Sequence, residues 1–289
     1  MRSSNPVLSR PDAFTSQQQP TQGGFQQPYG YQQQPGQQFP QQGYPQQGYP
    51  QGGYQQPGQY APQQPVQTGG VMTIDDVITK SAITLGTVIG VAALTFMFMP
   101  ARFLMAGMII SAIAGFVTVM VVAARRVINP GAVLIYAAVE GIFIGAVSKL
   151  YESLWNGIVP AAVLATVVAA AATLGAYKFF RIRVTNKFRK MVMIGTLAYA
   201  GVLLVNFVLS LFGINFLFGH GNMALLLLIS ALGVGLAVFN LILDFDYIEQ
   251  GIAMQAPAQE SWRAAFGLTV TLVWLYIEML RLLSYFRSN

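Results

Sequence analysis

Cysteine is absent from this chain of 289 residues, and histidine occurs once, at His220. The lack of cysteine excludes disulfides, thiol nucleophiles and sulfur-ligated metals, and one histidine cannot form a histidine metal site by itself. No nucleophile and base of the usual kind can therefore be paired. We predict that the protein is not an enzyme, and we expect no catalytic residue, no cofactor and no certain metal ligand.

Charge is scarce as well. Only 9% of the residues are charged and 54% are hydrophobic, whereas soluble domains contain about 25% charged and about 45–50% apolar residues. The formal net charge is +6, but the 16 Lys and Arg lie in a few short connectors between apolar runs. This placement indicates membrane topology. We therefore expect the lipid bilayer, and no nucleic acid, as the partner.

The N-terminal segment has another composition. No charged residue lies between Ala13 and Ile74, and Gln, Pro, Gly and Tyr dominate, with the near repeat QQGYP at 41–45 and 46–50. So little aliphatic surface cannot offset an ordering entropy of about 1–2 kcal/mol per residue. We predict that residues 1–72 form a disordered cytoplasmic tail, which is either a solvated tether or a segment that docks a partner.

Residues 73–289 contain seven apolar runs, each close to the roughly 20 residues that a helix needs to cross about 30 Å of hydrocarbon. These runs are 81–99, 102–124, 130–148, 158–178, 191–212, 223–243 and 264–285. They predict an all-α membrane protein, a bundle of seven transmembrane helices. Thr73 precedes Asp75 and Asp76 and is a suitable N-cap, so we expect the first helix to begin before Ser81.

Basic residues predict the orientation. With a cytoplasmic N-terminus, twelve of the 16 Lys and Arg lie inside, and Arg102, Lys149, Arg281 and Arg287 lie outside. Seven spans then place the C-terminus outside. The pair Arg125 and Arg126 ends the second span on the inner side. We expect the basic connector 178–190 to bind anionic lipid headgroups, at roughly 1 kcal/mol per basic residue; it contains Lys178, Arg181, Arg183, Lys187, Arg189 and Lys190.

Acids at membrane depth cost roughly 2.5–3.5 kcal/mol on insertion scales, so each is a candidate for function. Glu140 lies ten residues into the third run, about 15 Å deep. No cation is near it in sequence, because Lys149 lies at the outer end of the same run. Glu140 must find a partner on another helix, face a water-filled cavity or stay protonated. We interpret it as functional.

Asp244 ends the sixth run on the cytoplasmic side, and Asn240, one turn earlier, shares its face. Asp246 points to nearly the opposite side. For Asp246 and Glu249 we favour solvation at a helix end.

Glu278 lies in the outer half of the seventh run, with Arg281 three residues later and Thr271 seven residues earlier on the same face. An internal ion pair and a functional site are equally compatible with this spacing. By depth, Asp244, Glu140 and Glu278 form a ladder from the inner to the outer side. The ladder suits a cation or proton path if the three faces converge.

Several segments carry a family resemblance. The Arg125–Arg126 pair, the segment 241–248 (LILDFDYI) and the closing 275–283 (LYIEMLRLL) resemble the Bax inhibitor family, also called the transmembrane Bax inhibitor motif family. The segments 72–77 (MTIDDV) and 266–274 (FGLTVTLVW) look like those of YccA-like bacterial members of the actinobacterial type. The resemblance covers about residues 73–287 and implies a bundle of Bax inhibitor type in a bacterial plasma membrane.

The same resemblance implies a pH-sensitive calcium leak that is gated by two aspartates sharing a proton, in the sixth and seventh helices. Asp244 matches the first aspartate, but Thr271 stands where the second is expected. A threonine hydroxyl can hydrogen-bond a carboxylate but cannot share its charge. Glu140 and Glu278 are acids outside the family pattern, and we expect them to relocate the ion site or the proton sensor.

Two functions follow from these expectations. One is a passive leak for cations, with calcium as the expected ion and with candidate path or sensor residues Asp244, Glu140, Glu278, Thr271, Asn240 and Arg281. The other is a non-transporting regulator or accessory subunit of a membrane protease or another membrane protein complex, with the tail as its interaction segment.

Overall fold

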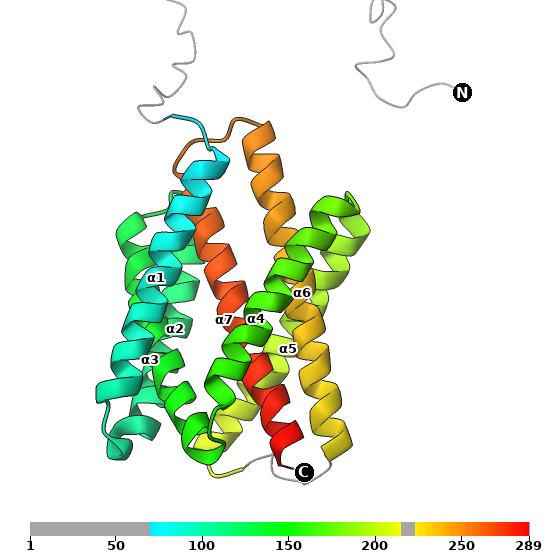
Figure 1. The fold of residues 1–289 in the computed structure, drawn as a ribbon. Coiled ribbons are helices and arrows are strands. Elements are labelled where there is room, and N and C mark those ends of the chain that lie inside the picture. The colour runs from blue at the N-terminus through cyan, green and yellow to red at the C-terminus, as the bar shows by residue number, and fades with distance from the viewer. Residues whose placement is uncertain (1–69, 215–222, 289) are drawn as a thin grey trace, which may run out of the picture. The chain divides into compact units, whose positions relative to one another are not determined.

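The structure is a computed structural model that describes residues 70–214 and 223–288. The predicted disordered tail, except for its last three residues, and His220 lie outside the described residues. Seven α-helices and one short 3-10 helix follow one another in the described part of the chain (Figure 1). They are α1 (Ile74–Phe98), η1 (Ala101–Phe103), α2 (Leu104–Ala124), α3 (Pro130–Leu154), α4 (Ile158–Phe179), α5 (Asn186–Leu211), α6 (Met223–Ala253) and α7 (Glu260–Arg287).

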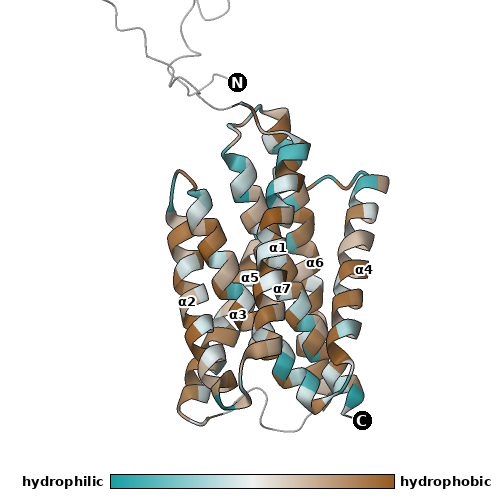
Figure 2. Cartoon of the chain, turned by 60° about the vertical axis from the view of Figure 1, so that its left-hand side comes forward, coloured by the Kyte–Doolittle hydropathy of each residue, from teal (hydrophilic) through white to brown (hydrophobic). Residues whose placement is uncertain are grey.

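All seven α-helices of the described residues, α2 together with η1, are long and apolar enough to cross a membrane. Apolar residues cover most of their length, as Figure 2 shows. Large hydrophobic side chains face outward: Leu164 is 65% exposed, Leu197 68% and Leu228 64%. Such a surface needs hydrocarbon around it. The prediction of an all-α bundle with seven spanning helices is confirmed.

The helix ends differ from the apolar runs. The residue ranges above show α1, α5 and α7 beginning several residues early, while α3 and α6 end late. Hydropathy marks only the stretch that crosses hydrocarbon, whereas backbone hydrogen bonds continue the helix into water. At 1.5 Å per residue, the 31 residues of α6 span about 46 Å. The expectation that a helix ends beside Asp244 is therefore wrong.

Side-chain caps explain several starts. The Thr73 hydroxyl accepts a hydrogen bond from the Asp76 amide at 3.2 Å, which confirms the predicted cap of α1. The Asn129 side chain accepts from the Gly131 amide at 2.8 Å, and Pro130 occupies the first turn of α3.

Helix α7 is the central element of the bundle. It contacts α1, α3, α4 and α6, and Figure 1 shows it behind and between α1 and α4. Helix α2 packs on α3, and α5 packs on α6. Polar residues in the middle of α7, such as Thr271 and Glu278, are therefore buried against other helices.

Two glycines let α1 and α3 approach closely. A Cβ at Gly141 would lie 2.8 Å from the Val88 carbonyl oxygen, and one at Gly145 would lie 2.5 Å from that of Ala92. Glycines four residues apart are typical of helix pairs in membranes whose backbones touch.

The last residues before α1 hold the connector between α6 and α7. The Met72 amide donates to the Ala256 carbonyl at 2.7 Å, and the Ala258 amide donates to the Gly70 carbonyl at 2.8 Å. We call this pairing of 70–72 with 256–258 the N-terminal clasp. Met72 is 2% exposed, and a Cβ at Gly251 would lie 2.7 Å from its sulfur. A force on residue 70 is therefore transmitted to the α6–α7 connector.

Substitution of Gly145 by alanine tests the α1–α3 contact. We expect Gly145→Ala to destabilise the protein by roughly 1–3 kcal/mol, because overpacking forces the helices apart. A Cβ at Gly86 on α1 would meet nothing within 4 Å, so Gly86→Ala is the control, and alone it should stabilise by about 0.5–1 kcal/mol. Thermal unfolding in detergent measures both. Equal midpoints for the two variants would contradict the close contact.

Candidate functional site

Asp244 and Thr271 face each other across the contact between α6 and α7. The Thr271 hydroxyl donates a hydrogen bond of 2.6 Å to the Asp244 carboxylate. Gly267, one turn before Thr271, leaves room for this carboxylate, since a Cβ there would lie 3.2 Å from Asp244 Oδ1. The residue at the expected second aspartate position thus lies against the first, and it brings a hydroxyl instead of a charge.

The other polar residues near Asp244 turn away from it. Asn240 donates to the Thr196 hydroxyl on α5 at 2.7 Å, while Asp244 points to α7. The expected common face of Asn240 and Asp244 therefore does not place them at one site. A helix leaves about 100° between successive residues, so four residues drift by some 40°, and this is enough to reach different neighbours.

Asp246 is largely shielded from solvent by an ion pair, which corrects the expectation that it is solvated, whereas Glu249 is exposed, as expected. Asp246 lies 2.8 Å from the Arg189 guanidinium, and its side chain is 13% exposed. Glu249 accepts a hydrogen bond of 2.8 Å from the Tyr177 hydroxyl. Because α6 continues to Ala253, the Asp246 carboxylate meets Arg189 of α5 before α6 ends. Asp246 points away from Asp244, as expected.

Glu278 is fully buried in a cluster of donors. The Arg281 guanidinium lies 3.2 Å from both of its oxygens, so the ion pair, one of the two alternatives that the spacing allowed, is present. The Tyr199 hydroxyl donates to Glu278 at 2.9 Å and the Trp274 indole N–H at 3.3 Å. A Cβ at Gly233 would lie 2.6 Å from the carboxyl carbon, so only glycine fits there. A buried carboxylate with three donors is well compensated.

A polar cavity of about 480 Å³ lies between α2, α3, α5 and α7. We call it the polar cavity. Its lining residues with polar side-chain atoms are Tyr136, Glu140, Asn206, Ser210, Trp274, Glu278 and Arg281. Asp244 is not among the described residues that line it. The ladder of three acids is therefore only partly assembled, with Glu140 and Glu278 on one cavity and Asp244 on another contact.

Glu140 points to this cavity without a partner of its own. It makes no hydrogen bond or ion pair with another described residue. Gly115 of α2 leaves room for its carboxylate, since a Cβ there would lie 3.1 Å from Glu140 Oε2. Of the three expectations for Glu140, the described residues leave the cavity and the protonated state. A carboxylate in such a place is available to a cation or to water.

Arg125 and Arg126 contribute backbone hydrogen-bond acceptors as well as positively charged side chains. Their carbonyl oxygens accept hydrogen bonds from the Arg263 guanidinium, at 2.8 Å for Arg126. Both side chains remain exposed at the end of α2. The basic pair therefore fastens the start of α7 to the end of α2 and lies apart from the buried acids.

Helix α5 supplies residues that the sequence interpretation did not single out. Tyr199 bonds Glu278, and Asn206 lines the polar cavity. Asn206 interrupts an apolar run and Tyr199 precedes it by seven residues, so both lie on one helix face. This spacing of polar residues in an apolar run is the sequence feature that indicates both residues.

No group of three or more His, Asp or Glu that could hold a metal ion occurs in the ranges that the structure describes.

The sequence matches one family model, described as Bax inhibitor 1 like, over residues 5–288. No curated protein matches the chain. This is a family of membrane proteins that are not known as enzymes. A bundle of seven spanning helices agrees with the match. The chain belongs to the Bax inhibitor 1-like family.

Proposed function

We propose that the protein is a passive cation leak or channel of a bacterial plasma membrane, with calcium as the conducted ion. The polar cavity carries the proposal, since it combines the unpartnered Glu140 with Glu278 inside a membrane-spanning bundle. The N-terminus lies in the cytoplasm and the C-terminus outside, as the distribution of Lys and Arg favours. The branch within the family stays a prediction.

The cost of Glu140 supports an ionic role. Insertion of such a side chain into a bilayer costs roughly 2.5–3.5 kcal/mol, so a carboxylate without protein partners is usually functional. Glu140, Ser210 and the Asn206 amide offer oxygen atoms to one space, and oxygen is the ligand that calcium takes. Conduction also requires binding that is weak enough to release the ion. One unpaired acid meets that requirement better than a dense cluster.

Asp244, hydrogen-bonded by Thr271 at the α6–α7 contact, is a second acid of the path. This pair has one charge, so it cannot act as a proton-sharing switch between two carboxylates. A pH response of the leak then arises at Glu140 or Glu278, the acids of the polar cavity.

A second candidate function is a non-transporting regulator or accessory subunit of a membrane protease or another membrane complex. The N-terminal clasp favours it, because the clasp attaches the last residues of the tail to the α6–α7 connector by two backbone hydrogen bonds. A partner bound to the tail would be coupled mechanically to α6 and α7.

Calcium flux into liposomes tests the leak. We expect Glu140→Gln and Asp244→Asn each to lower the flux by about tenfold, which corresponds to roughly 1.4 kcal/mol of lost attraction for the ion. Both amides keep the shape and, at Asp244, the acceptor for Thr271. Glu249→Gln removes an acid that faces Tyr177 and should leave the flux unchanged. Equal fluxes in all variants, or none above empty liposomes, would refute the proposal.

Substitution of Thr271 by aspartate tests the meaning of the missing carboxylate. Thr271→Asp places two carboxylates at hydrogen-bonding distance, and such a pair holds one proton between them. We expect the pH profile of the flux to gain a titration step beyond any that arises at Glu140 or Glu278 in the parent. Thr271→Asn has the same shape without the charge and should keep the parental profile. If the aspartate and asparagine variants give identical pH profiles, the pair is not a sensor.

Deletion of residues 1–69 separates the two functions. The deletion removes residues 1–69 but keeps the clasp at 70–72, so we expect the bundle to keep its fold. We expect calcium flux to survive and proteins that co-purify through the tail to be lost. Loss of flux with unchanged thermal stability would favour a tail-dependent regulator.

A further inference from the structure

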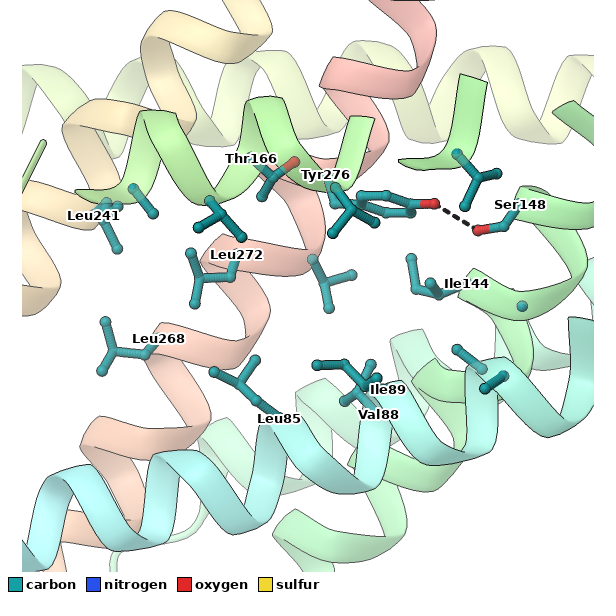
Figure 3. A pocket seen from close by; sticks show the side chains of 18 of the residues that line it. Leu85, Val88, Ile89, Ile144, Ser148, Thr166, Leu241, Leu268, Leu272 and Tyr276 are labelled. Atoms are coloured by element: carbon teal, nitrogen blue, oxygen red, sulfur yellow. Dashed lines mark hydrogen bonds between the residues drawn. The ribbon is translucent and has the colours of Figure 1, made fainter. Parts of the chain in front are cut away.

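A second, apolar cavity lies on the opposite side of α7. Its volume is about 730 Å³, and its walls come from α1, α3, α4, α6 and α7. In Figure 3, Leu85, Val88 and Ile89 of α1 lie opposite Thr166 of α4, with Leu268 and Leu272 of α7 between them. We call it the α1–α4 groove. This volume is within the roughly 300–1,000 Å³ of ligand sites in proteins.

The groove opens sideways, to the surroundings of the bundle. Helices α1 and α4 both line it, yet their backbones are not in contact anywhere along their described lengths. The lining residues at the opening are exposed: Ile89 by 67% and Val167 by 59%. Because α1 and α4 are membrane-spanning helices, this opening faces the hydrocarbon of the bilayer.

Water is a poor occupant of the groove. Three of its lining residues carry side-chain polar atoms, and these atoms are already used. The hydroxyls of Ser148 and Tyr276 bond each other at 2.7 Å, and Thr166 donates to the Ala162 carbonyl at 2.7 Å. A cavity water needs two to four polar partners. An empty groove, in turn, would leave its wall without packing contacts.

We propose that the α1–α4 groove binds one acyl chain of an anionic phospholipid. The lining runs from Val159 to Leu174 on α4, which is about 22 Å at the helical rise. One leaflet contributes about half of the roughly 30 Å of hydrocarbon, so a single chain fits this length. Inside the groove the chain contacts protein on three sides.

The charge beside the groove selects the headgroup. Lys178 lies one turn beyond Leu174 on the same face of α4 and is exposed. Phe179 and Phe180, 82% and 71% exposed, follow at the depth where aromatic residues anchor a helix in the interface. The connector adds Arg181 and Arg183. A basic group at this place attracts an anionic headgroup whose chain enters below it.

Two neighbouring valines give a matched test. Val167 lines the groove and Val168 does not, and both are 59% exposed. The full-length protein is reconstituted in vesicles of equal parts phosphatidylglycerol and phosphatidylcholine and then extracted into detergent. Native mass spectrometry counts the phospholipids that stay bound. We expect the parent to retain phosphatidylglycerol, Val167→Trp to retain less than half as much, and Val168→Trp to equal the parent.

Lys178→Gln tests the headgroup and should abolish the preference for phosphatidylglycerol over phosphatidylcholine. Equal retention by both tryptophan variants, or detergent as the only bound molecule in the parent, would overturn the proposal. If Val167→Trp does not fold, Ala171→Phe, one turn further on the groove face, replaces it, with Ala172→Phe as its control. The outcome is independent of calcium flux, so the lipid site and the leak can fail separately.

Discussion

The absence of water from a bilayer is the constraint on which this structure depends. A polar side chain inside the membrane must find its partners within the protein or line a cavity. Glu278 follows the first course, with Arg281, Tyr199 and Trp274 as donors. Glu140 follows the second, beside the polar cavity. The two glutamates lie on one cavity and yet differ in availability, and this difference gives the proposed leak a single exposed charge.

Helix α7 brings these arrangements together. Its residues Thr271 and Glu278 lie seven positions apart on one face, and both meet α6, at Asp244 and Gly233. The N-terminal clasp and the Arg263 bonds to the end of α2 fix the start of the same helix. A shift of α7 along α6 would change both acids at once. The tail, the basic pair and the buried acids are therefore connected through one element.

The number of spans could be predicted from the sequence because hydrophobic length is a local property, set by the thickness of the membrane. The cap at Thr73 and the ion pair of Glu278 with Arg281 were also within reach, since both depend on spacings of three residues along one helix. The environment of Asp246 could not be predicted, because it depends on Arg189 from another helix and on the extension of α6 beyond its apolar run. Convergence of Glu140 with Glu278, and the divergence of Asn240 from Asp244, likewise require the positions of whole helices.

The polar cavity and the α1–α4 groove lie on the two sides of α7, and Val273 lines both. Each space selects its occupant by what its wall offers. The Glu140 carboxylate, which bonds no described residue, favours water and ions on one side, and a wall with no unused polar atom favours hydrocarbon on the other. Leu241 and Phe245 flank Asp244 in sequence, and Leu272 adjoins Thr271; all three line the groove. An acyl chain there would press on the α6–α7 contact from behind, so lipid occupancy and the state of Asp244 are expected to be linked through the packing of these two helices.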